Sequence, residues 1–74
     1  MEKEILELLS EAFPQVDFTS SEELVDEGVL DSLTIVELVS CLTMEYDIVI
    51  SYDEIIPENF NSIAAIAKMV EKLK

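Results

Sequence analysis

The spacing of apolar residues predicts an amphipathic helix at the start of the chain. The apolar positions recur at helical spacing with acidic residues between them: Ile5, Leu8, Leu9 and Ala12. This helix should end near Pro14, because proline stops a helical pattern. No period persists from residue 15 to 30, and Gly28 interrupts that stretch. We therefore expect a long ordered loop with at most a short helical turn, and loops of this length are usually functional.

A second helix is predicted from Asp31, a favourable N-cap residue, to about Tyr46. At about 100° per residue its apolar side chains fall into two groups. The group expected to face the core comprises Ile35, Leu38, Val39, Leu42 and Tyr46. The group expected to face solvent, in a row that passes Ser40 and lies beside Ser32, comprises Leu33, Val36 and Met44. Such a row, flanked by acids such as Glu37, predicts a docking surface, unless the helix is buried on most sides.

Two further helices follow from the pattern. A short third helix is expected over residues 53–56, closed by Pro57. The last helix should begin at Asn61 or Ser62. Its two C-terminal lysines are favourably placed against the helix dipole. Its apolar face comprises Ile63, Ile66, Ala67, Val70 and Leu73. The two lysines are Lys72 and Lys74.

The β-branched run at residues 47–50 resembles a strand in isolation. A single strand has nothing to pair with, so we interpret it as an extended connection that inserts apolar side chains into the core. Composition agrees with a helical fold: among 74 residues half are hydrophobic, Trp is absent, and there are 1 Gly and 2 Pro. The predicted fold class is all-α, a small four-helix bundle in one domain over residues 1–74.

The charge is large and unevenly distributed. The formal net charge is −13, and no Lys or Arg lies between Lys3 and Lys68. The stretch from Glu22 to Glu58 holds eleven acids. Such a field repels nucleic acid and anionic membranes and attracts basic protein surfaces. The alternative is that the acidity merely keeps a small protein soluble.

Composition also disfavours most catalytic chemistry. With no histidine and one cysteine, the chain cannot assemble a Ser-His-Asp or Cys-His arrangement or an ordinary zinc site. No calcium-binding loop pattern is present. We therefore expect no enzyme activity, no catalytic residues and no bound metal. The charged start does not resemble a signal peptide, and no apolar run approaches the roughly 20 residues of a membrane span. One unpaired cysteine favours a cytoplasmic protein without stable membrane insertion.

Four segments spread over almost the whole chain carry a family resemblance. They are Gly28-Val29-Leu30-Asp31-Ser32-Leu33, Val36-Glu37-Leu38, Glu45-Tyr46-Asp47-Ile48 and Phe60-Asn61-Ser62-Ile63. Together with the acidic bias and the helix order, they resemble the acyl carrier protein family. The resemblance implies that Ser32 is esterified by 4′-phosphopantetheine, whose terminal thiol holds an acyl or aminoacyl group as a thioester. It also implies delivery of that cargo in fatty acid, polyketide, nonribosomal peptide or D-alanylation pathways.

The resemblance also implies partners and residue roles. The expected partners are a phosphopantetheinyl transferase (holo-carrier synthase), an acyl- or aminoacyl-loading ligase or transferase, and a downstream synthase or acyltransferase. Asp31 would act in recognition by the phosphopantetheinyl transferase, with N-capping as the structural alternative. The expected partner-binding residues are Leu33, Val36, Glu37 and Met44. Gly28 is expected to supply a left-handed or tightly turned backbone, and Cys41 to be a packing residue. We expect a monomer.

Several positions depart from the fatty-acid carriers, which usually have acids or a proline there: Thr34, Thr43, Met44 and Ser51. The segment from Glu27 to Ser32 resembles D-alanyl carriers and stand-alone aminoacyl or peptidyl carriers as well, which an adenylating ligase loads. The subtype stays open, and we expect a discrete carrier outside the housekeeping fatty-acid pathway. The alternative function is a non-enzymatic acidic adaptor or inhibitor that binds basic protein surfaces, which needs neither Ser32 nor Gly28.

Overall fold

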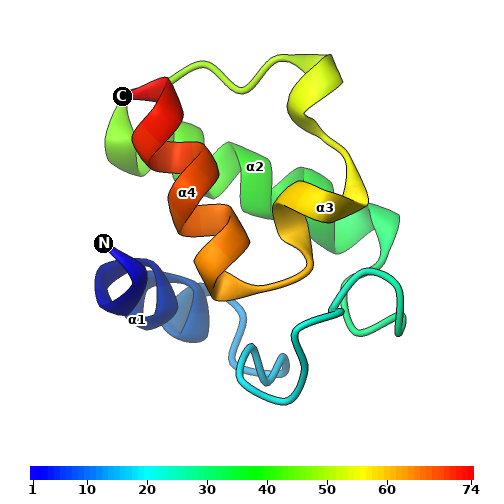
Figure 1. Ribbon diagram of the computed structural model, residues 1–74. Coiled ribbons are helices and arrows are strands. Elements are labelled where there is room, and N and C mark those ends of the chain that lie inside the picture. The colour runs from blue at the N-terminus through cyan, green and yellow to red at the C-terminus, as the bar shows by residue number, and fades with distance from the viewer.

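The computed structural model describes residues 1–74 and contains four α-helices, one short 3-10 helix and no strand (Figure 1). The elements are α1 (Glu2–Ala12), α2 (Ser32–Tyr46), η1 (Tyr52–Glu54), α3 (Pro57–Phe60) and α4 (Ile63–Leu73). Helix α4 packs against both α1 and α3. The prediction of a small all-α bundle with a long loop between the first two helices and a short third helix is confirmed. Every helix falls short of the length and hydrophobicity that a membrane crossing requires.

The core is built entirely from hydrophobic side chains, and no polar or charged residue is buried. All four α-helices contribute to it, and so does the long loop, through Phe18, Leu24 and Leu30. Burying each of these large side chains stabilises the fold by about 1.5–3 kcal/mol. The loop is therefore anchored in the core at three points along its length. The buried residues are Ile5, Leu9, Phe13, Phe18, Leu24, Leu30, Leu38, Leu42, Ile48, Phe60, Ile66, Ala67, Met69 and Val70.

Asn61, at the junction of α3 and α4, fixes the middle of the long loop. Its backbone carbonyl accepts a hydrogen bond from the Leu24 N–H at 2.8 Å. Its side-chain Oδ1 accepts the N–H groups of Val25 and Asp26 at 2.9 and 3.2 Å. Its Nδ2 donates to the Asp26 carboxylate at 3.2 Å. Because this loop leads directly into α2, the Asn61 hydrogen bonds help to set where α2 begins.

The segment between α2 and α4 differs from the sequence prediction. A helix over residues 53–56 closed by Pro57 is wrong. A 3-10 helix covers Tyr52–Glu54, and Pro57 opens α3 instead of ending a helix. Proline suits the first position of a helix, because its φ is already helical and its missing N–H would have no partner there.

The connection after α2 is extended, as predicted, and forms no strand. Helix α2 ends at Tyr46, and its C-cap, Asp47, adopts the left-handed conformation with φ 53° and ψ 48°. Ile48 is then buried in the core, Val49 points to solvent, and Ile50 is half-buried. The chain thus reaches η1 with alternate side chains anchored in the protein.

Candidate functional site

Ser32 is the first residue of α2 and is exposed. The helix begins there because Asp31, with φ −93° and ψ 177°, is the N-cap, and its Oδ1 accepts the N–H of Thr34 at 2.8 Å. The hydrogen bonds from Thr34 hold the pKa of the Asp31 carboxyl below its usual value. Since Asp31 supplies the cap, the Ser32 hydroxyl is not needed for capping and stays at the surface.

A tight turn directs the chain into this helix start. Gly28 has φ +78°, which side-chain-bearing residues rarely adopt, and its N–H donates to the Val25 carbonyl at 3.1 Å. A Cβ at Gly28 would touch nothing, so the backbone conformation rather than space favours glycine. After the turn, the Leu30 N–H donates to the Leu24 carbonyl at 3.0 Å and the Leu30 side chain is buried. The predicted left-handed backbone at Gly28 is confirmed, and it places Ser32 two residues after a core anchor.

An apolar groove of about 360 Å³ begins at Ser32. Its walls come from the long loop, from α2, and from the segment that contains η1 and α3. Seven of its nine lining residues are hydrophobic, and Ser32 is the only serine among them. The lining residues are Val25, Ser32, Ile35, Val36, Tyr52, Ile55, Ile56, Pro57 and Phe60.

Helix α2 has two apolar faces, as the sequence predicted. Leu38 and Leu42 are buried, whereas Leu33, Val36 and Met44 are 69%, 62% and 82% exposed. A helix buried on most sides is therefore excluded. Exposed Glu37 lies on the same helix.

The predicted site residues fall into two groups along α2. Asp31, Ser32 and Leu33 are consecutive at its start, and Val36 lines the groove together with Ser32. Met44 lies near the other end of the helix, about 18 Å from Ser32 along the axis at 1.5 Å per residue. Cys41 is half-buried, and burial, followed by the charge of Glu45, raises the pKa of its thiol. This environment agrees with the packing role expected for Cys41.

Sequence reasoning missed the far wall of the groove. Tyr52 is 90% exposed and Ile56 is 40% exposed, and both line the groove beside Ser32. The only local signal was the presence of one aromatic residue, Tyr52, and the apolar pair Ile55-Ile56 in a segment without a clear period. Their proximity to Ser32 depends on how η1 and α3 fold back against α2, which local patterns do not encode.

Comparison with known proteins identifies a family and several relatives. The family described as "Phosphopantetheine attachment site" matches residues 3–70. A D-alanyl carrier protein of Streptococcus pyogenes serotype M1 is 33% identical over 75 residues, covering 100% of this chain and 95% of that protein. A D-alanyl carrier protein of Lactobacillus delbrueckii subsp. bulgaricus is 29% identical over 76 residues, covering 100% of this chain and 94% of that protein. No solved structure matches the chain.

Proposed function

The chain belongs to the phosphopantetheine attachment site family and is a carrier protein whose 4′-phosphopantetheine is bound covalently to a serine, and on that premise we propose that Ser32 is the attachment residue. The position of Ser32 in the structure is the observation that carries the proposal. Ser32 is an exposed serine at a helix start and the only serine that lines the apolar groove between α2, η1 and α3. A group attached to its hydroxyl would have solvent on one side and the groove on the other.

The residues around Ser32 fit the two chemical parts of such a group. Its phosphate would lie next to the N–H groups of Ser32 and Leu33. Because these residues lie in the first turn of α2, their N–H groups have no carbonyl acceptor within the helix. The less polar part has the groove of about 360 Å³ within reach. When attached, the arm supplies a terminal thiol that holds cargo as a thioester. The protein needs no catalytic side chain of its own for this task, because the enzymes it visits perform the chemistry.

The exposed face of α2 supports the proposal of a partner-binding surface. Leu33, Val36 and Met44 leave apolar area in solvent without contributing to the core, and Glu37 adds charge beside them. An apolar row set in an acidic surface suits enzymes with basic, partly apolar docking sites. We assign this surface to the phosphopantetheinyl transferase, the loading enzyme and the downstream acceptor enzyme, each of which must approach Ser32. Asp31, adjacent to Ser32 and exposed, is a recognition residue for the transferase as well as the helix cap.

For the cargo, we propose D-alanine or a related amino acid, loaded by an adenylating ligase in the cytoplasm. Support comes from the relatives named D-alanyl carrier protein, which match over the full length of this chain at 29–33% identity. Two positions on α2 agree with a carrier outside fatty-acid synthesis. Thr34 and Met44 stand where fatty-acid carriers usually have acids.

Intact mass measurement tests the attachment site. After incubation with coenzyme A and a broad-specificity phosphopantetheinyl transferase, the protein should gain one phosphopantetheinyl group. Ser32→Ala should gain none. Ser40→Ala is the matched control, because Ser40 is also exposed on α2 but lies away from the groove, and this variant should be modified fully. Modification of Ser32→Ala, or loss of modification in Ser40→Ala, would reject Ser32 as the attachment residue.

The same modified protein tests the cargo. Offered ATP and D-alanine with a D-alanine-activating ligase, it should acquire D-alanine, and it should react far more slowly with a fatty-acyl ligase and its substrate. Preferential loading of the fatty acid would overturn the cargo assignment while leaving the attachment site in place.

A further inference from the structure

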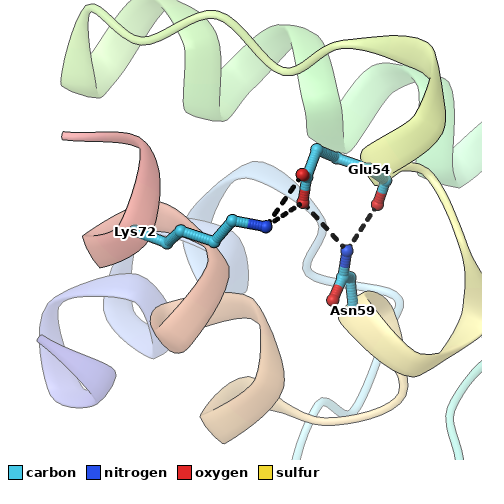
Figure 2. Close-up of polar contacts among 3 residues, drawn as sticks. All are labelled: Glu54, Asn59 and Lys72. Carbon is cyan, nitrogen blue, oxygen red and sulfur yellow. Dashed lines mark hydrogen bonds and ion pairs between the residues drawn. The ribbon is translucent and has the colours of Figure 1, made fainter.

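A small polar network joins η1, α3 and α4 (Figure 2). Lys72 on α4 donates to both carboxylate oxygens of Glu54, at 2.9 Å to Oε2 and 3.2 Å to Oε1. Asn59 on α3 donates through Nδ2 to the Glu54 carbonyl at 2.7 Å and to Glu54 Oε1 at 3.3 Å. The Glu54 to Lys72 contact is the only ion pair in the protein.

Lys72 pairs with Glu54 although the protein has many other acidic side chains. The chain has 17 acidic residues and four lysines, so most carboxylates lack a counter-charge. The neighbouring acids Asp53 and Glu58 are exposed, whereas the Glu54 side chain is only 17% exposed against 65% for that of Lys72. Glu54 therefore points inward between the short helices, where Asn59 also binds it.

This network holds a wall of the groove that packing holds only weakly. None of the residues of η1 is buried, and Tyr52 at its start is almost fully exposed. The wall opposite α2 is nevertheless formed by Tyr52, Ile55 and Ile56, together with α3. Phe60, at the end of α3, is fixed in the core and Ile55 is half-buried against it, but Tyr52 and Ile56 on the outer side of the wall are exposed. The contacts of Glu54 with Lys72 and Asn59 are the polar ties between η1 and the two helices behind it.

We propose that the Glu54–Lys72 ion pair is a latch that fixes η1 as the outer wall of the groove and so sets how far the groove opens beside Ser32. Glu54 and Lys72 are then positioning residues, since they act on the attached group only through Tyr52 and Ile55. The occupant of the groove rests on the function proposed above, but the latch itself is a property of the unmodified protein.

The first test uses the unmodified protein and NMR measurement of amide exchange with water. The reporter groups are the Ile55 N–H, bonded to the Tyr52 carbonyl at 3.0 Å, and the Asn59 N–H, bonded to the Ile56 carbonyl at 3.0 Å. Lys72→Met and Glu54→Gln should each speed exchange at these amides by about two- to fivefold, the range expected from an exposed ion pair acting on a local opening. Amides in α1 and α2 should keep their rates.

Lys68→Met is the matched control. It removes the same charge from the same helix, but Lys68 forms no ion pair, so the rates at Ile55 and Asn59 should not change. The double variant Glu54→Lys with Lys72→Glu restores the attraction and should return exchange toward the original rate. Equal effects of Lys68→Met and Lys72→Met, or faster exchange throughout the protein, would overturn the latch.

A second readout concerns the loaded protein. If the latch sets the opening of the groove and the arm draws its thioester into it, Lys72→Met should shorten the lifetime of the bound cargo against hydrolysis, and Lys68→Met should not. An unchanged lifetime alongside faster amide exchange would overturn the link between latch and groove. Failure of Ser32 to accept the arm would instead reject the proposed function, and the exchange result on the unmodified protein would stand.

Discussion

Asp31 links the stability of α2 to the surroundings of Ser32. Its carboxylate accepts the Thr34 N–H at the positive end of the helix dipole, and both effects favour the ionised form. The pKa of the Asp31 carboxyl is lowered accordingly, chiefly by the backbone hydrogen bond from Thr34. Protonation of this one carboxyl therefore weakens the helix end that presents Ser32.

Asp31→Ala should lower the melting temperature by a few degrees near neutral pH, because the cap is lost. The folded-state pKa lies below the ordinary value of 3.8, so the ionic contribution is complete above that pH and disappears as pH falls through the folded-state pKa. The difference in melting temperature between the original and Asp31→Ala should narrow in acid to the contribution of an uncharged cap. Asp31→Asn keeps a capping oxygen without the charge, so at neutral pH its melting temperature should lie between those of the original and Asp31→Ala. A difference that stays constant from neutral to acid pH would contradict this role of the charge.

At the scale of one element, α2 packs one face into the core and leaves the other, the proposed partner-binding surface, in solvent. Leu38 and Leu42 hold the core, while Val36 contributes exposed apolar area next to Ser32. Charged substitution on the exposed face should therefore leave the helix intact but place an unpaired carboxylate in any complex formed there.

Val36→Asp should fold with unchanged helical content and lose transfer by partner enzymes about tenfold or more, since burying an unpaired charge at an interface costs at least the roughly 1.4 kcal/mol that a tenfold change represents. Circular dichroism and the rate of modification by the transferase provide the two measurements. Val49→Asp is the control, because Val49 is also exposed but lies on the connection after α2. Loss of helical content in Val36→Asp, or equal loss of transfer in both variants, would count against the proposed surface.

The same element shows how far the sequence predicts this protein. The start of α2, its two faces and the turn at Gly28 follow from local rules, namely capping, helical periodicity and the preference of glycine for positive φ. The sequence does not place the helix at Pro57, because proline can either end a helix or open one. In the structure Pro57 opens α3, and Phe60 at its end is buried in the core. The groove and the Asn61 contacts join residues far apart in the chain, for which no local pattern exists.

For the whole molecule, the net charge of −13 implies strong self-repulsion, relieved at close range by a single ion pair. Added salt screens the many repulsions more than it weakens that one attraction. The melting temperature should therefore rise by several degrees between low salt and about 1 M, where the Debye length is about 3 Å. Sodium chloride and choline chloride should act alike, because screening depends on ionic strength. A melting temperature independent of either salt would show that the acidic charges do not oppose folding.

Tyr52 at the rim of the groove offers a label-free optical test of whether the groove is occupied. The chain has no Trp and two Tyr, so tyrosine emission is not lost by energy transfer to an indole. Tyr46 is half-buried, with the Lys74 Nζ 5.7 Å from its ring centre, and gives a background that Tyr46→Phe removes. Tyr52 alone lies at the rim of the groove. If the attached group occupies the groove, as proposed, we expect the fluorescence intensity and anisotropy of Tyr52 to differ between the unmodified and the loaded protein.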